Sequence, residues 1–377
     1  MSAPTATGTG LGVAVERLDV LACTVPTDAP ESDGTLAWDS TTIVVVESHG
    51  GGHTGLGYTY GHASAAGLIR DVLAEAVVGR EASAVPAAWA AMARAVRNLG
   101  RPGVAAGAIA AVDTALWDLK ARLLDLPLVT LLGAARESVE LYGSGGFTSY
   151  TDERLAEQLG GWAEEGFGAV KLKVGREPGR DLERVAVARR ALGAEPHLFV
   201  DANGALARKQ ALACAEAFAE HDVTWFEEPV SSDDLEGLRL LRDRAPAGME
   251  IAAGEYGYDL PGFRRLLEAG AVDVLQADAT RCAGITGFLR VAALCEAFGV
   301  PLSAHTAPAL HLHVCCAVEP LRHLEWFHDH ARVERMLFDG VTQPRAGRLF
   351  PDLSRPGLGL ELKRADAERH LSSGGAG

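Results

Sequence analysis

Apolar and polar positions divide this 377-residue chain into two regions with different periods. Residues 11–62 contain apolar runs bounded by turn residues, which is typical of β-strands, and residues 62–124 favour helices. The clearest helix is expected over residues 105–124, where apolar residues recur at helical spacing. From about residue 138 short apolar strands alternate with amphipathic helices. Residues 1–10 are expected to be disordered.

Eight strand-like runs follow one another in the second region. They are Val139–Gly143, Ala169–Val174, the runs that end at Asp201, Glu227, Glu255, Asp278 and His305, and His323–Phe327. Polar residues at these positions recur every 20–28 residues from Lys173 to Glu325, the length of one strand plus one helix. Repeated right-handed crossovers of this length predict an α/β fold, a (β/α)8 TIM-type barrel. The stretch 356–362 is expected to add one strand after the barrel.

Composition narrows the class of protein. Hydrophobic residues make up 48% of the chain and charged residues 23%, as in ordinary globular proteins. The net charge of −15 argues against a nucleic-acid partner. No run of 18 apolar residues and no secretory signal is visible, so we expect a cytoplasmic protein without a membrane partner. The six cysteines form no CxxC pair and are interpreted as reduced thiols.

Three acidic residues at strand ends indicate a metal site. Asp201, Glu227 and Glu255 each end a predicted strand, and the carboxyl ends of barrel strands converge on one mouth. Three carboxylates at one point repel one another unless a cation lies between them. Oxygen ligands in this number suit Mg²⁺, and the absence of Cys and His among them argues against zinc.

Two lysines and an acid–imidazole pair occupy the strands on either side. Lys171 and Lys173 are two apart on a strand and therefore share a face, where each ammonium is expected to lower the pKa of the other and make a base. Schiff-base chemistry is the alternative for such a lysine. Asp278 and His305 end neighbouring strands, an arrangement that favours an imidazole acting as general acid or base.

Glu325 completes the set at the end of the eighth predicted strand, either as a protonated hydrogen-bond donor or as a salt-bridge partner. A metal with bases on both sides indicates one reaction type. It is Mg²⁺-dependent abstraction of the proton α to a substrate carboxylate, through an enediolate intermediate.

Seven motifs together resemble the enolase superfamily, and within it the mandelate racemase subgroup. They are residues 111–120 (Ala-Val-Asp-Thr-Ala-Leu-Trp-Asp-Leu-Lys), 171–173 (Lys-Leu-Lys), 200–203 (Val-Asp-Ala-Asn), 225–229 (Trp-Phe-Glu-Glu-Pro), 253–255 (Ala-Gly-Glu), Asp278 with 284–287 (Gly-Ile-Thr-Gly), and 303–305 (Ser-Ala-His). The resemblance implies an N-terminal α+β capping domain (1–136), a modified barrel (137–335) and a C-terminal segment that returns to the cap (336–377).

The resemblance also implies roles for individual residues. Asp201, Glu227 and Glu255 match the Mg²⁺ ligands, whereas Glu228 is not expected to bind metal. Lys173 matches the catalytic lysine and Lys171 its neighbour. Asp278 and His305 match a His–Asp dyad, and Glu325 matches a residue that hydrogen-bonds the substrate carboxylate. Asn203, within the 200–203 motif, is a candidate substrate-binding residue.

The implied activity is dehydration of an acid sugar to a 2-keto-3-deoxy acid, with Lys173 as base and His305 as acid; the two roles can exchange with the stereochemistry of the α-carbon. Racemisation or epimerisation of an α-hydroxy acid, as in mandelate racemase, is the alternative. A non-catalytic ligand-binding barrel is a distant one. The expected partners are a small carboxylate substrate and further copies of the chain in a homo-oligomer.

The stretch 49–61 carries a literal G-x-G-x-x-G at Gly50, Gly52 and Gly55, which raises the distant alternative of an NAD(P)-dependent oxidoreductase. No helix pattern begins after Gly55, so we favour a strand–turn–strand hairpin. Cap loops of the resembling family close over the substrate. His49, His53, Tyr58 and Tyr60 are therefore candidate specificity residues.

Overall fold

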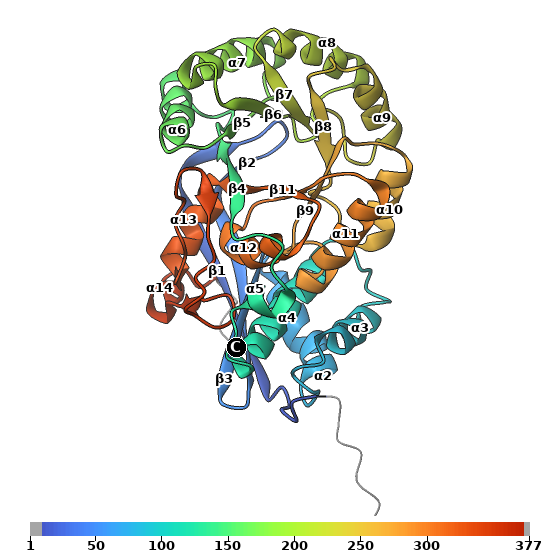
Figure 1. Cartoon of the computed structure of the whole chain (residues 1–377), viewed down its shortest axis with the longest axis vertical. Helices are drawn as coiled ribbons and strands as arrows, with labels where there is room; N and C mark the ends of the chain where they lie inside the picture. Colours follow the sequence, from blue (N-terminus) through green and yellow to red (C-terminus); the bar gives the residue numbers. More distant parts are fainter. Residues whose placement is uncertain (1–9, 373–377) are drawn as a thin grey trace, which may run out of the picture.

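The computed structural model describes residues 10–372. They form an antiparallel sheet covered by helices, a closed parallel barrel, and a C-terminal segment beside the sheet (Figure 1). The predicted disorder of residues 1–10 concerns, apart from Gly10, residues outside this range. The barrel is the green-to-orange ring in Figure 1, and the N-terminal region lies below it in blue and cyan.

The N-terminal sheet contains three strands in the order β1, β2, β3. They are β1 (Arg17–Ser32), β2 (Ala37–Gly50) and β3 (His53–Tyr60). The residues between β2 and β3, Gly51 and Gly52, have φ angles of 59° and 77°, which two-residue hairpin turns require and glycine adopts without strain. The predicted hairpin is therefore confirmed. Because β3 rather than a helix follows the glycines, the dinucleotide-binding hypothesis is wrong.

Six short or medium helices follow the sheet. They are α1 (Ser64–Leu68), the π-helical turn η1 (Ile69–Leu73), α2 (Ala74–Val77), α3 (Val85–Ala95), α4 (Val104–Leu123) and α5 (Leu128–Leu132). The helix predicted over residues 105–124 is confirmed as α4. Gly55 and Gly57 allow β3 to lie directly on α4, since a Cβ at either position would meet the α4 backbone. Close packing, and not phosphate binding, explains these two glycines.

Two buried carboxylates of α4 join the N-terminal region to the rest of the chain. Asp113 accepts hydrogen bonds from the backbone nitrogen and the hydroxyl of Thr286, at 2.8 and 2.7 Å. Asp118 accepts from the backbone nitrogens of Leu56 and Leu358, at 2.7 and 2.5 Å. These bonds give a structural reason for the acidic residues of the 111–120 motif.

The barrel alternates eight parallel strands with eight helices. These are β4 (Val139–Gly145), α6 (Asp152–Glu164), β5 (Ala169–Lys173), α7 (Pro178–Leu192), β6 (His197–Asp201), α8 (Arg208–Ala219), β7 (Val223–Glu227), α9 (Leu235–Arg244), β8 (Glu250–Ala253), α10 (Leu260–Glu268), β9 (Val274–Ala277), α11 (Gly284–Phe298), β10 (Leu302–Ala304), α12 (Pro308–Ala317), β11 (Leu321–Phe327) and α13 (His328–Leu337). Parallel pairing of β11 with β4 closes the barrel. The predicted (β/α)8 barrel is confirmed.

Two acidic residues lie differently from the prediction. Strand β8 stops at Ala253 because Gly254, with φ of 134°, leaves the β region, so Glu255 lies on the loop after the strand. Strand β11 ends at Phe327, as predicted, so Glu325 lies inside the strand and not at its end. Both side chains nevertheless face the barrel mouth described below.

The C-terminal segment contains β12 (Phe338–Asp339), β13 (Arg348–Leu349), β14 (Glu361–Leu362) and α14 (Arg364–Glu368). The strand predicted over residues 356–362 is reduced to β14, because Gly357 and Gly359 have positive φ. The segment then reaches the N-terminal sheet, where the backbone nitrogen of Ser372 donates to the carbonyl of Ala22 at 2.9 Å.

None of the helices within residues 10–372 has both the length and the apolar character that a bilayer crossing needs. All six cysteines lie in this range, none is in a disulfide, and five are buried.

Glu334 of α13 ties the cap to the barrel and provides a pH-dependent prediction. Its carboxyl group accepts from the Tyr58 hydroxyl at 2.5 Å and from the backbone nitrogen of Ala309 at 3.0 Å. Burial raises the pKa of Glu334 from 4.5 to about 8, although these hydrogen bonds act in the opposite direction. The folded protein therefore holds a proton that the unfolded chain releases above pH 4.5, and the free energy of unfolding falls as pH rises from 4.5 to 8.

In Glu334→Gln this contribution is absent. We expect the melting temperature of the wild type to fall relative to that of the variant between pH 5 and pH 8, by the equivalent of up to a few kcal/mol at ~1.4 kcal/mol per pKa unit. Thermal unfolding of both proteins across this range tests the prediction. Parallel curves would mean that the pKa of Glu334 is not raised in the folded protein, which is then ionised at this residue across the whole range.

Candidate active site

Three buried carboxylates meet at the carboxyl end of the barrel. Asp201 ends β6, Glu227 ends β7, and Glu255 follows β8. One carboxylate oxygen from each residue lies within 4.8 Å of the others. The sequence predicted this grouping, and the structure brings the three side chains together. Oxygen donors in this arrangement fit Mg²⁺, and the triad contains no softer donor that would favour zinc.

The electrostatics of the triad also fit a cation. Burial, followed by the neighbouring Asp201, raises the pKa of Glu227 to about 8. The Trp225 indole nitrogen donates to Glu227 Oε2 at 3.1 Å and orients it. A divalent cation between buried carboxylates relieves their mutual repulsion, so binding a metal would stabilise the ionised triad.

Both lysines of β5 point into the mouth beside the triad. Lys171 Nζ lies 2.6 Å from Glu227 Oε1 and 3.4 Å from Asp201 Oδ2, and it is fully buried. Lys173 Nζ lies 2.5 Å from Asp201 Oδ2 and lines the mouth cavity. The predicted shared face is confirmed, because both ammonium groups contact the same carboxylate.

The predicted lowering of the lysine pKa values is not what the structure shows. Burial lowers the pKa of Lys173, but the surrounding carboxylates, Asp201 foremost and then Glu255 and Glu227, together outweigh burial and the neighbouring ammonium, and the pKa is raised above 10.5. The Lys-x-Lys spacing predicts only the effect of one ammonium on the other, whereas the carboxylates that surround both come from other strands. A divalent cation at the triad adds positive charge beside Lys173 and acts in the direction of a lower pKa.

The Asp278–His305 pair forms across the mouth from Lys173. His305 Nδ1 lies 3.0 Å from Asp278 Oδ2, and His305 Nε2 lies 3.0 Å from Glu255 Oε2. Burial lowers the pKa of His305, but Glu255 and its other carboxylate neighbours raise it to about 9. The Asp278 contact leaves Nε2 as the nitrogen that faces the mouth.

Glu325 lies between the two groups. Its Oε1 is 2.9 Å from Lys171 Nζ, and its Oε2 is 3.8 Å from His305 Nε2. Burial raises the pKa of Glu325, but Lys171 and then His305 lower it to about 2. Of the two roles considered for this residue, the geometry favours the salt bridge.

A cavity of about 280 Å³, the mouth cavity, lies over these groups. Lys173, His305 and Glu255 line it from the barrel. The cap contributes Asp33 and Leu36 from the connection between β1 and β2, and Trp38, Ser40, Thr41 and Thr42 from the first half of β2; none of them was a predicted site residue. A Cβ at Gly34 would meet the carbonyl oxygens of Ala202 and Val174, so only glycine lets this connection lie so close to the barrel.

The predicted specificity residues divide between two ends of the cap sheet. Tyr60 lines the mouth cavity, and so does Asn203. His49 and His53 flank the β2–β3 turn and are absent from its lining; His49 instead lies 2.9 Å from Asp19. Tyr58 is buried against Glu334. The structure does not bring these three residues to the mouth cavity: the two histidines lie at the β2–β3 turn, the far end of the hairpin from Tyr60, and Tyr58 packs against Glu334 instead.

One feature of the sequence indicates the turn that connects β1 and β2. Asp33 and Gly34 form a turn in which Asp33 Oδ1 accepts from the backbone nitrogens of Thr35 and Leu36, at 2.6 and 2.7 Å. The turn is recognisable from residue types alone. Its position over the mouth depends on tertiary contacts, such as the 2.8 Å bond from the Thr148 nitrogen to the Ser32 carbonyl.

Comparisons with known proteins agree with this architecture. The N-terminal domain model of mandelate racemase and muconate lactonizing enzyme matches residues 19–133, and the enolase C-terminal domain-like model matches residues 154–367. The L-talarate/galactarate dehydratase of Salmonella typhimurium is 34% identical over 82% of this chain and 78% of its own.

Two solved structures are similar over almost the full chain. A mandelate racemase/muconate lactonizing enzyme-like protein from Rubrobacter xylanophilus is 60% identical, with a TM-score of 0.94, over 95% of this chain and all of its own. A racemase from Streptomyces coelicolor A3(2) with bound magnesium is 31% identical, with a TM-score of 0.89, over 95% of this chain and all of its own. The chain therefore belongs to the mandelate racemase/muconate lactonizing enzyme family of the enolase superfamily.

Proposed function

We propose that the protein is a Mg²⁺-dependent acid-sugar dehydratase that removes the proton α to a carboxylate and expels the β-hydroxyl. The observation that carries the proposal is that Lys173 and His305 line one cavity together with Glu255, which belongs to the Asp201–Glu227–Glu255 triad. A substrate held there has one proton-transfer group on each side of its α-carbon. The similarity to a dehydratase supports the same reaction.

Each residue has a defined task in this proposal. Asp201, Glu227 and Glu255 hold the cation. When bound, Mg²⁺ supplies positive charge to the substrate carboxylate, whose oxygens gain negative charge as the α-proton leaves. Lys173 Nζ takes the α-proton, and Lys171 stays paired with Glu227 and Glu325 beside it.

His305 acts on the other side of the substrate. Its Nε2 gives a proton to the β-hydroxyl, so that the group leaves as water, and the resulting enol becomes the 2-keto-3-deoxy acid. Asp278, 3.0 Å from Nδ1, keeps the ring oriented for this transfer. With the opposite stereochemistry at the α-carbon the two groups exchange roles.

Racemisation is the second candidate. It uses the same two groups to remove a proton from one face of the α-carbon and return one to the other, and the similarity to a racemase favours it. Loss of a β-hydroxyl separates the two reactions, because only dehydration consumes the acid.

¹H NMR of the protein with Mg²⁺ in D₂O, against pooled acid sugars and α-hydroxy acids, tests the proposal. We expect loss of one acid and growth of a 2-keto-3-deoxy product, and no change in a sample from which the metal has been removed by chelation. Exchange of an α-proton without loss of the acid would indicate racemisation or epimerisation. Silence with every acid would contradict both candidates.

A further inference from the structure

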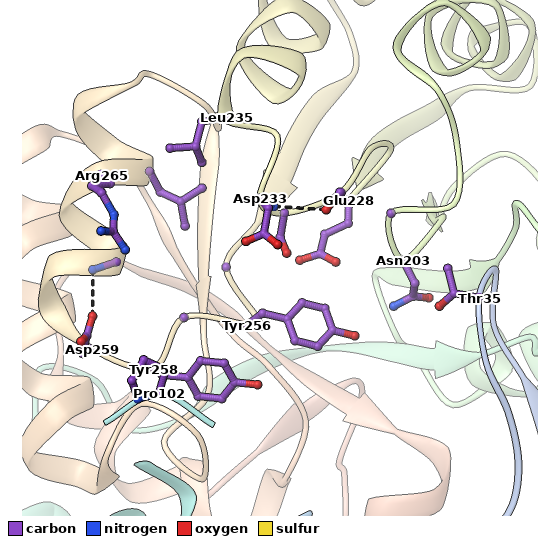
Figure 2. Close-up of a pocket in the computed structure, with 17 residues that line it drawn as sticks. Thr35, Pro102, Asn203, Glu228, Asp233, Leu235, Tyr256, Tyr258, Asp259 and Arg265 are labelled. Atoms are coloured by element: carbon purple, nitrogen blue, oxygen red, sulfur yellow. Dashed lines mark hydrogen bonds between the residues drawn. The ribbon is translucent and has the colours of Figure 1, made fainter. Parts of the chain in front are cut away.

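A larger cavity, of about 810 Å³, opens beside the mouth cavity (Figure 2). Asn203 and Tyr256 line both cavities, so the two cavities adjoin at these residues. Thr35 covers the larger cavity from the same β1–β2 connection that covers the mouth. We call it the side cavity, and its principal residues are Asn203, Glu228, Asp233, Tyr256, Asp259 and Arg265.

Glu228 provides a buried hydrogen-bond acceptor in the side cavity. The residue is 1% exposed, and its Oε1 has no hydrogen-bond partner among residues 10–372. Figure 2 shows its carboxylate pointing into the hollow that Tyr256 and Asn203 border. Backbone bonds hold it there: its nitrogen donates to the Ala252 carbonyl at 2.9 Å, and its carbonyl accepts from Gly204 at 2.8 Å.

Asn203 presents a second acceptor. Its side-chain Oδ1 is buried and has no partner within the described part of the chain. Its φ angle is 46° and that of Glu228 is 36°, a left-handed conformation that non-glycine residues hold only where their surroundings impose it. Such conformations concentrate at ligand sites, and here both orient an acceptor toward the same space.

Unpaired acceptors call for a ligand with hydrogen-bond donors. Leaving a buried polar oxygen without a donor costs free energy, and more so for a charged group. Hydroxyl groups supply such donors, and a sugar chain carries one on each carbon. A carboxylate carries no proton to donate at neutral pH.

The charge of the side cavity points the same way. Besides Glu228, its lining contains the carboxylates of Asp233 and Asp259 and one cation, Arg265, which lies on the exposed side of α10. Burial and the neighbouring Glu255 raise the pKa of Glu228 well above its usual range, so the charge of the lining is that of the other three residues. The nearby Arg281 already faces Glu255 and Asp278, at 3.6 Å from an oxygen of each. Among the residues that line the side cavity only Arg265 could pair with a second carboxylate, and Asp233 and Asp259 would repel it.

We propose that the side cavity binds the hydroxylated far end of the substrate and selects monocarboxylic acid sugars over dicarboxylic ones. The inference rests on the proposed function, which places the reacting carboxylate at the triad. The chain then passes between Asn203 and Tyr256, and its terminal hydroxyls donate to Glu228 and Asn203. Each substrate hydroxyl that displaces water here donates a hydrogen bond to one of these acceptors, so that the buried oxygen stays paired.

Matched pairs of six-carbon acid sugars test this selectivity. The two members of a pair share the configuration at C2 to C5 and differ only at C6, which is a hydroxymethyl group or a carboxylate. At saturating Mg²⁺ we expect kcat/KM for the hydroxymethyl member of the reactive pair to exceed that of its partner at least ~10-fold, because like charges in close contact cost several kcal/mol. Equal turnover, or preference for the dicarboxylate, would overturn the inference and leave the proposed dehydration standing.

If no member of any pair reacts or exchanges its α-proton, the proposed function fails and this inference fails with it.

When turnover is seen, the Glu228→Gln variant tests whether Glu228 is responsible for the selectivity. We expect the ratio of kcat/KM values within the pair to fall at least ~5-fold, chiefly through a loss for the hydroxymethyl member, since an amide nitrogen replaces one of the two oxygens that accept from its hydroxyl. Calorimetry confirms that the variant is measured with Mg²⁺ bound.

Glu236→Gln is the matched control. It makes the same substitution on an exposed residue of α9 that does not line the cavity, and the ratio should stay at the wild-type value. Asp233→Asn removes a charge from the cavity wall without altering a buried residue, and it serves if Glu228→Gln does not fold. A wild-type ratio in every folded variant of the two would overturn the inference.

Discussion

Replacing Lys173 with alanine is expected to abolish turnover while the protein stays folded. The variant lacks the group that takes the α-proton, and loss of a general base costs up to about 10⁴-fold in rate. We expect kcat to fall at least ~10³-fold. The fold should tolerate the change, because Lys171 remains 3.4 Å from Asp201 and keeps that buried carboxylate paired. Kinetics with the identified substrate, together with a melting curve, test both parts.

His305→Asn separates the two proton-transfer roles. If Lys173 is the base and His305 the acid, this variant still exchanges the α-proton of the substrate with D₂O but no longer forms the 2-keto-3-deoxy acid. Lys173→Ala shows neither. If the roles are reversed, the exchange survives in Lys173→Ala and is lost in His305→Asn. Wild-type turnover in either variant would remove that residue from the mechanism.

Much of the barrel was predictable because most of its strands are short apolar runs followed by a polar residue that lies at the mouth. Asp201, Glu227 and His305 were found in this way, and their convergence follows from the geometry of any closed parallel barrel. Glu255 and Glu325 lie at the mouth as expected, although Glu255 follows the end of β8 and Glu325 lies inside β11. The domain boundaries at residues 136 and 335 stay a prediction.

The cap was less predictable for a physical reason. A hairpin brings side chains near each other, but only tertiary contacts decide which of its ends faces the barrel. The glycine-rich turn beside His53 attracted attention through composition, whereas the Asp33–Gly34 turn that covers the mouth is shorter and less distinctive. The pKa of Lys173 shows the same limit, because the direction of its shift depends on carboxylates that lie 28 or more residues away in the sequence.

Glu227→Gln is expected to weaken Mg²⁺ binding strongly and to abolish turnover at physiological Mg²⁺. An amide keeps the shape of the side chain but removes one of three anionic ligands, and Mg²⁺ prefers charged oxygen donors. Loss of a supporting residue around a metal typically costs 10–100-fold in affinity, so loss of a direct ligand should cost at least ~100-fold. Isothermal titration calorimetry of the metal-free protein with MgCl₂ gives the affinity.

Glu228→Gln provides the comparison that distinguishes a ligand from a nearby charge. Glu228 is buried one residue further along the chain, yet only Glu227 belongs to the group of described carboxylates whose oxygens converge within 4.8 Å. If Glu227 is a ligand, its substitution must reduce Mg²⁺ affinity much more than the same substitution at Glu228, which changes only the surrounding field. Equal losses would mean that net charge, and not coordination by Glu227, controls binding. Unchanged affinity in Glu227→Gln would place the metal elsewhere.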